Sequence, residues 1–192
     1  MAKLRFYYGT MNSSKTANLL MVRHNYLEQG KQIQVFKPAI DTRDVGVVKS
    51  RALNEKVPAI LVDSSTKDFI FDSVKKERPS CVLIDEVQFL NTLQIIELGR
   101  IVDELNIPVI AYGLLTDFKG ELFEGSKKLI EIGAVLSEIK TVCMYCTTKA
   151  SYNMRLNNGK PVTHGEIVQV GGNESYQPVC RKHYNEFTQG KH

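Results

Sequence analysis

The chain has 192 residues, a formal net charge of +4, and a composition of 43% hydrophobic and 24% charged residues. This length allows one large domain, or a core domain with a small appendage, around a substantial hydrophobic core. No apolar run approaches the roughly 20 residues of a membrane-spanning helix, and the first residues lack the apolar segment of a signal peptide, so we expect a cytoplasmic protein without a membrane role.

Short apolar runs alternate with helical periodicity over the first two-thirds of the chain. Strands are predicted at Leu4–Tyr8, Gln32–Phe36, Ala59–Val62, Cys81–Ile84 and Pro108–Tyr112. An amphipathic helix is predicted from apolar residues three and four positions apart, at Leu98, Ile101, Val102 and Leu105. Alternation of this kind favours an α/β fold, with a parallel sheet flanked by helices.

The first predicted strand runs into a candidate phosphate-binding loop. The loop comprises Gly9, Thr10, Met11, Asn12, Ser13, Ser14, Lys15 and Thr16. The helical stretch Ala17–Gln29 follows, so the loop has the strand-loop-helix context of the GxxxxGK[ST] motif. In such a loop, backbone N–H groups face the phosphates, Lys15 adds a positive charge and the Thr16 hydroxyl can hold Mg²⁺. We therefore predict that residues 1–140 form a P-loop NTPase-type domain that binds a nucleoside triphosphate.

One position departs from this motif, because Ser14 stands where the second glycine is expected. If the position requires a positive φ, a residue other than glycine costs about 1 kcal/mol. We expect a loosened loop that still binds ATP.

A second motif lies at the end of the predicted strand Cys81–Ile84, which is followed by the carboxylates Asp85 and Glu86. An apolar strand of this type is typical of a Walker B motif, in which Asp85 would hold the Mg²⁺ that bridges the phosphates. Glu86 could accept a proton from a substrate hydroxyl or orient a water molecule, and the sequence does not separate these roles. Both residues could instead be ordinary acidic residues at a helix N-terminus.

The segment from Lys37 to Pro58 reads as a loop that could fold over a nucleotide. It carries Asp41, Arg43 and Arg51, and arginine binds phosphate through two parallel hydrogen bonds. Taken alone, each arginine could equally be a surface charge.

The composition and pattern of the chain change from about Thr141. Cysteines, short strands and turn dipeptides there predict a second, smaller lobe over residues 141–192. Two pairs of residues have the spacing of a tetrahedral structural zinc site, and they are Cys143 with Cys146 and Cys180 with His183. A structural zinc ion would stabilise a lobe that has little core of its own. The residues after Tyr184 are polar and are predicted to be frayed.

Taken in order, these motifs resemble the type II thymidine kinases, and the resemblance covers nearly the whole chain. Besides the phosphate loop and the four candidate zinc ligands, the segments that carry it are Asp41–Arg43, Ile84–Phe89, Tyr112–Phe118 and Gly171–Tyr176. In some members a cysteine stands at the position of His183, and histidine also binds zinc well.

The resemblance implies roles for individual residues. Glu86 would be the catalytic base for the 5′-hydroxyl of thymidine, with Asp85 on Mg²⁺ and Arg43 near the transferred phosphate. Cofactor binding would extend over Asp41, Arg43, Asp85, Glu86, Val87 and Gln88. The thymine base would be contacted by Phe89, Phe118 and Phe123, although each phenylalanine alone is a typical core residue. A C-terminal lasso would close on the base through Ile167, Val168, Gln169, Val170, Gly171 and Tyr176.

The resemblance also implies a cytoplasmic homotetramer in nucleotide salvage. Thymidine would be the substrate and deoxyuridine a possible second one, with MgATP as phosphate donor, dTTP as feedback inhibitor and structural zinc. Nucleic acid would not be a partner.

Two other readings stay open from the residues. A P-loop ATPase would use Glu86 to orient water, and it would hydrolyse ATP without a nucleoside. A zinc-knuckle module could grip single-stranded nucleic acid through nearby basic residues such as Lys149, Arg155 and Arg181, although a net charge of +4 is low for that task.

Overall fold

The computed structural model describes residues 1–40, 45–50, 52–167 and 174–189. Its centre is a six-stranded sheet in the order β5-β2-β6-β7-β1-β8, in which every pairing is parallel. The strands are β1 (Leu4–Tyr8), β2 (Ile33–Pro38), β5 (Ile60–Val62), β6 (Cys81–Ile84), β7 (Val109–Gly113) and β8 (Val135–Glu138). The predicted α/β fold and all five predicted strands are confirmed, with shifts of one or two residues at some ends.

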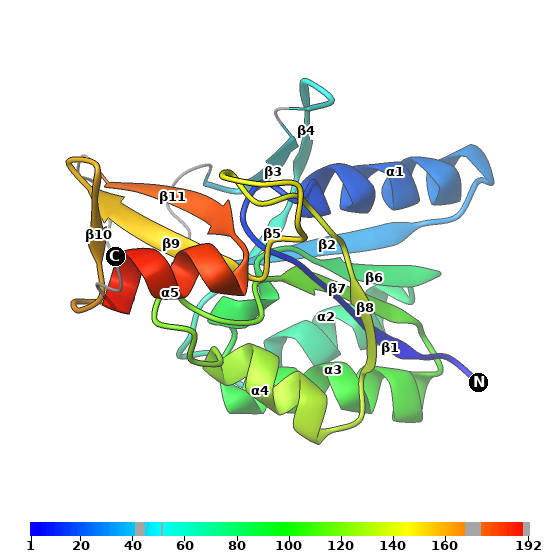
Figure 1. The fold of residues 1–192 in the computed structure, drawn as a ribbon. Helices are drawn as coiled ribbons and strands as arrows, with labels where there is room; N and C mark the ends of the chain where they lie inside the picture. Colours follow the sequence, from blue (N-terminus) through cyan, green and yellow to red (C-terminus); the bar gives the residue numbers. More distant parts are fainter. Residues whose placement is uncertain (41–44, 51, 168–173, 190–192) are drawn as a thin grey trace.

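Helices cover both faces of this sheet. They are α1 (Lys15–Glu28), α2 (Phe69–Glu77), α3 (Thr92–Leu105) and α4 (Glu124–Glu131), with a short 3₁₀ turn, η1 (Val87–Phe89), after β6. Figure 1 shows α1 on one side of the sheet and α2, α3 and α4 on the other. The inner strands β6 and β7 are therefore buried on both faces, which explains why they read as nearly continuous apolar runs.

The side chains of β6 illustrate how the two faces differ. Val82 and Ile84 belong to the core under α2, α3 and α4, whereas Cys81 and Leu83 belong to the core under α1. Successive residues of a strand point to opposite faces, so the next residue, Asp85, continues on the side of α1.

The segment after β2 is not the loop that the sequence predicted. It contains an antiparallel hairpin of β3 (Val47–Ser50) and β4 (Glu55–Pro58). Val48 and Val57 are buried and pack in the same cluster as Leu19 and Leu20 of α1. The hairpin projects beside α1 in Figure 1.

The C-terminal part forms a smaller antiparallel sheet in the order β10-β9-β11. Its strands are β9 (Tyr152–Asn157), β10 (Lys160–Val162) and β11 (Glu174–Val179), followed by the helix α5 (Arg181–Gln189). The prediction of a frayed tail after Tyr184 is thus wrong as far as Gln189. Tyr184 stacks on Tyr152 with ring centroids 4.3 Å apart, which holds the helix against β9.

We call residues 1–140 the large lobe and residues 141–189 the small lobe, although the division into two domains remains a prediction. The lobes are in contact, since the Tyr184 hydroxyl donates a hydrogen bond of 2.7 Å to the Phe118 carbonyl. Within the described residues, none of the helices has the length and apolar character needed to cross a membrane.

Candidate active site

The candidate phosphate loop lies between the end of β1 and the start of α1, as the sequence predicted. Gly9 is buried, and a Cβ atom there would collide with the Ile139 carbonyl oxygen and with Ser13. Lys15 folds over the loop, and its Nζ lies 3.2 Å from Gly9 O and 2.7 Å from Thr10 O. The glycine is therefore required by space, and the ammonium group lies where phosphate oxygens would meet it.

The helix begins immediately after Ser14, whose φ of 62° is left-handed. This is the positive φ that the motif was expected to require, so the serine carries the steric cost of that conformation. Asn12 is also left-handed, with a φ of 61°. Two such residues turn the backbone so that the first N–H groups of α1 point out of the helix end.

Two other residues of the loop have unusual surroundings. The Met11 N–H donates a hydrogen bond of 2.7 Å to Asn153 Oδ1 of β9, so the small lobe holds one side of the loop. Thr10 Oγ1 is buried and has no hydrogen-bond partner among the described residues. A buried hydroxyl of this kind fits an anionic ligand that would accept its hydrogen bond.

The loop meets the acidic pair at the carboxyl end of β6. The Thr16 hydroxyl donates a hydrogen bond of 3.4 Å to Asp85 Oδ2, so the two motifs share one site. Asp85 is only 6% exposed. Its burial, followed by the repulsion of the Glu86 carboxylate, raises its pKa above the ordinary value, against the opposing charges of Lys37 and Lys15. A hydroxyl and a buried carboxylate are oxygen ligands that suit Mg²⁺.

Glu86 occupies a strained position where β6 ends. Its φ is 51°, a conformation that residues other than glycine rarely adopt. Its carboxylate accepts a hydrogen bond of 2.6 Å from Gln88 Nε2. Strain of this kind is concentrated at functional sites, where surrounding contacts hold it in place.

Lys37 is a residue that the sequence analysis did not single out as functional. It lies on β2, one position beyond the paired residues Phe36 and Ile84, and is therefore beside Asp85. It is 3% exposed, and its ammonium donates to the Val47 carbonyl at 3.3 Å. A charged residue at the end of an apolar strand was the available signal, but the predicted strand ended at Phe36, one residue earlier.

The four candidate zinc ligands converge in the small lobe. The ligand atoms of Cys143, Cys146, Cys180 and His183 all lie within 4.8 Å of one another. His183 Nδ1 is 3.3 Å from Cys143 Sγ and 3.4 Å from Cys180 Sγ, and Cys146 Sγ is 3.9 Å from Cys180 Sγ. Bonds of about 2.3 Å to sulfur and 2.0–2.1 Å to nitrogen in a tetrahedron require similar spacings, so the donor set fits zinc.

The two buried thiols of the cluster differ in ionisation, since the pKa of Cys180 is raised and that of Cys143 is lowered. Burial opposes the ionisation of Cys143, but hydrogen bonds from the backbones of Cys180 and Tyr145, together with His183 and Cys146, lower its pKa to about 6. The other ring nitrogen of His183, Nε2, lies 3.9 Å from Glu186 Oε2. Such an outer carboxylate helps to orient a metal-binding histidine.

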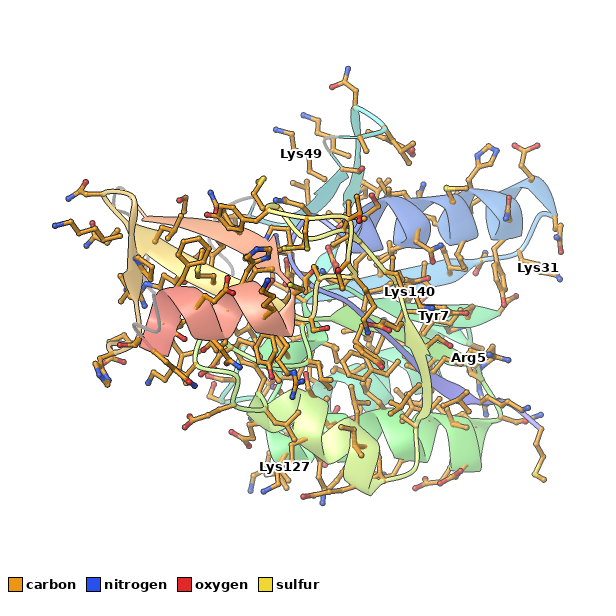
Figure 2. All side chains as sticks on the ribbon, viewed as in Figure 1. Arg5, Tyr7, Lys31, Lys49, Lys127 and Lys140 are labelled. Carbon is orange, nitrogen blue, oxygen red and sulfur yellow. The ribbon has the colours of Figure 1, made fainter. Side chains whose placement is uncertain are left out.

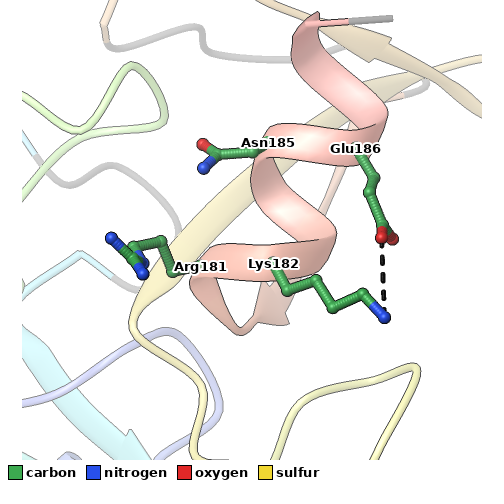
Figure 3. A pocket seen from close by; sticks show the side chains of 4 residues that line it. All are labelled: Arg181, Lys182, Asn185 and Glu186. Atoms are coloured by element: carbon green, nitrogen blue, oxygen red, sulfur yellow. Dashed lines mark ion pairs between the residues drawn. The ribbon is translucent and has the colours of Figure 1, made fainter. Parts of the chain in front are cut away.

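A hollow on α5 lies away from the phosphate loop and next to the cysteine–histidine cluster. Arg181, Lys182, Asn185 and Glu186 line it, and Lys182 pairs with Glu186 at 3.7 Å (Figure 3). All four residues come from one exposed helix face, so the hollow is part of a solvated charged surface.

With this geometry in place, comparison with known proteins identifies the family. A match to the family described as thymidine kinase covers residues 2–184. A thymidine kinase of Streptococcus pyogenes serotype M3 is 51% identical over 185 residues, which are 96% of this chain and 97% of the relative. One of Lactococcus lactis subsp. lactis is 50% identical over the same shares of each chain. The chain belongs to the thymidine kinase family.

Among solved structures, that of AMPPCP-bound DnaA from Aquifex aeolicus aligns with 73% of this chain and 41% of its own, at a TM-score of 0.45 and 18% identity.

Of the aromatic residues that the thymidine kinase resemblance placed near thymine, two lie together. Phe89 and Phe123 are half-buried and meet edge to face, with ring centroids 5.7 Å apart. Phe118 is 2% exposed, and the Arg155 guanidinium covers its ring at 4.7 Å. Of these three phenylalanines, Phe89 and Phe123 therefore have side-chain surface left to contact a ligand.

The remaining predicted positions are only partly described. Val87 is fully buried in the large-lobe core, Ile167 is 43% exposed, and Tyr176 is half-buried on β11 opposite Arg155. The predictions for Asp41, Arg43, Val168, Gln169, Val170 and Gly171 lie outside the described residues.

Proposed function

We propose that this chain transfers the γ-phosphate of ATP to the 5′-hydroxyl of thymidine, giving dTMP and ADP, with deoxyuridine as a second acceptor. Family membership supports the activity. The structural observation that carries the site assignment is the hydrogen bond from Thr16 to Asp85, because it joins the phosphate loop to the acidic pair in one site.

In this proposal the loop from Gly9 to Thr16 binds the phosphates of ATP, and Lys15 and Lys37 supply positive charge on the side of α1. Thr16 and Asp85 would hold Mg²⁺. The metal, when bound, neutralises charge that develops on the phosphate oxygens during transfer. Burial of Asp85 strengthens these electrostatic contacts, since they act in a medium less polar than water.

Glu86 is the proposed catalytic base. The proton of the thymidine hydroxyl moves to its carboxylate as the hydroxyl oxygen forms a bond to the γ-phosphorus. The bond from that phosphorus to the bridging oxygen breaks, and ADP leaves with the bond's electron pair. The protein contributes mainly by aligning the two substrates and by stabilising charge.

Phe89 and Phe123 are proposed to contact the thymine base, and the lasso from Ile167 to Tyr176 to close over it. The four-ligand cluster is proposed to hold structural zinc, because three cysteines and a histidine leave no open position for catalysis. A cytoplasmic location, a homotetramer and inhibition by dTTP are further proposals that rest on the family resemblance.

Replacing Glu86 by glutamine tests the base. Glutamine keeps the shape of the side chain and cannot take the proton, so turnover should fall by roughly 10²-fold or more. The measurement is ADP release with and without thymidine, alongside a check of folding by circular dichroism. Near-normal turnover in a folded E86Q protein would reject the assignment.

The same assay separates the kinase from a P-loop ATPase. The kinase should release ADP only when a nucleoside acceptor is present, whereas an ATPase should release it at the same rate without one. A nucleic-acid module is not favoured, because basic residues that would grip the strand are engaged within the protein. Lys149 pairs with Glu138 at 2.7 Å, and Arg155 is 3% exposed and lies over the ring of Phe118. Other basic residues, such as Lys31, Lys49 and Lys127 in Figure 2, lie on different parts of the chain.

A further inference from the structure

We infer that Gln88 is a positioning residue, a buried carboxamide that fixes the Glu86 carboxylate to the end of β7. This inference rests on the proposed role of Glu86 as the base. It differs from the contact with ATP that the family resemblance implied for Gln88.

The Gln88 side chain is engaged at both ends and is 2% exposed. Its Nε2 donates to Glu86 Oε2 at 2.6 Å, and its Oε1 accepts from the Leu114 backbone N–H at 3.0 Å. A backbone N–H can only donate, so the oxygen of the amide must face Leu114. The amino group is therefore forced to face Glu86, and the orientation of the amide is determined by its partners.

The far end of this connection is itself held in place. The Leu114 carbonyl accepts a hydrogen bond of 2.6 Å from the Ser126 hydroxyl in α4. Gly113, the preceding residue, has no room for a side chain, because a Cβ atom would collide with Gln88 Oε1 and would lie 2.9 Å from Val87 Cγ1. The amide is thus enclosed by β7, η1 and α4 of the large lobe.

Glu86 needs such support for two reasons. Its backbone is left-handed, and its carboxylate is next to Asp85, whose negative charge repels it. The bond from Gln88 holds Oε2 of this carboxylate towards Leu114, at the end of β7, against that repulsion.

The test replaces Gln88 by methionine, which keeps its length and removes both hydrogen bonds. Misplacing the base should lower kcat by roughly ten- to a hundredfold and leave the KM values for thymidine and ATP within about twofold. Gln94→Met is the matched control. Gln94 is 1% exposed, and its amide also bonds at both ends, to Asp63 O at 2.8 Å and from Asn91 N at 3.2 Å. Its loss should affect stability and leave kcat unchanged.

A double-mutant cycle distinguishes positioning from a general structural effect. If Gln88 acts through Glu86, adding Q88M to E86Q should lower kcat no further, whereas independent effects would multiply. Should Q88M fail to fold, Gln88→Glu retains an acceptor for Leu114 and places an oxygen against Glu86, and the same loss of kcat is expected.

Three results would overturn the inference. One is normal kcat in folded Q88M or Q88E while E86Q is inactive, in which case the proposed function still stands. Another is a raised KM for ATP with unchanged kcat, which would mean direct contact with the nucleotide. The last is multiplication of the two losses in the cycle. Normal turnover in E86Q would instead reject the proposed function itself.

Discussion

The two lobes bury their polar groups in different ways. The large lobe surrounds its sheet with two apolar clusters, and it satisfies a buried charge such as Glu97 with backbone N–H groups. The small lobe has one cluster among the described residues, and two of its five buried members, Cys143 and Cys180, are also candidate zinc ligands. The large lobe thus has extensive apolar packing, whereas the small lobe has little, and we expect it to rely on the proposed zinc ion.

Removal of zinc should therefore give the largest difference in stability between the two lobes. Binding of structural zinc is worth about 10–16 kcal/mol in small zinc peptides, which is as large as the whole free energy of unfolding of a typical protein, about 5–15 kcal/mol. Chelation, or Cys143→Ser, should unfold the small lobe and leave the helical signal of the large lobe. Bound zinc and thermal unfolding followed by circular dichroism are the measurements.

The control for that experiment is Cys81→Ser, which changes the buried cysteine of β6 in the large lobe. This variant should keep one zinc per chain although it loses some stability. A wild-type protein without zinc after gentle purification, or full zinc in C143S, would contradict the assignment of the cluster.

The second prediction concerns the buried carboxylate of the large lobe. Glu97 of α3 is 3% exposed and accepts hydrogen bonds from the N–H groups of Asp68, Ile70 and Phe71 at 2.9, 2.9 and 3.1 Å. It thereby caps the start of α2. Glu97→Gln turns an acceptor into a donor and leaves a buried N–H unpaired, which should cost about 1–3 kcal/mol.

Urea unfolding measures this cost. The variant should unfold at a lower urea concentration, and the dependence of the unfolding free energy on urea should keep the same slope. Glu104→Gln is the matched control, since Glu104 is exposed on the same helix and only pairs with Arg100 at the surface. It should change the midpoint little. Equal midpoints for the two variants would show that the capping contacts do not stabilise the large lobe.

The smallest expected effect is at Ser14, in the phosphate loop. Glycine would remove the cost of the left-handed backbone, which is roughly 1–2 kcal/mol. Its greater freedom in the unfolded chain would lower the free energy of unfolding by about 0.5–1 kcal/mol, which offsets part of that gain. Ser14→Gly should therefore raise stability by about 0.5–1 kcal/mol in thermal unfolding. Ser14→Ala keeps the strain and should give no such gain, so equal stability of the two variants would rule out the backbone as the cause.

The sequence was most informative where the pattern was continuous. β6 is buried on both faces and appears as an unbroken apolar run, β1 is interrupted only by Arg5, and each leads directly into its candidate motif. Lys15, Thr16, Asp85 and Glu86 could be singled out for that reason. The candidate zinc ligands could be predicted equally well, because the spacing of cysteine and histidine in the sequence reflects ligand geometry directly.

Elements at the surface were harder to predict. β8 is an edge strand with Val135 and Leu136 exposed, and α5 buries none of its described side chains, so neither has a clear apolar period. The hairpin of β3 and β4 places single valines in the core between polar residues. Contacts between residues that are distant in the sequence could not be predicted for another reason. No local pattern indicates that Gln88 contacts Leu114 or that Met11 contacts Asn153.

The hydrogen bond between Met11 and Asn153 has a consequence for the order of folding. The two residues are 142 positions apart, so the nascent chain cannot complete this contact until β9 has left the ribosome. Until then the Met11 N–H lacks its amide partner, and the loop can sample conformations that do not fit a triphosphate. The nucleotide pocket is therefore finished late in synthesis, although its signature begins at the ninth residue.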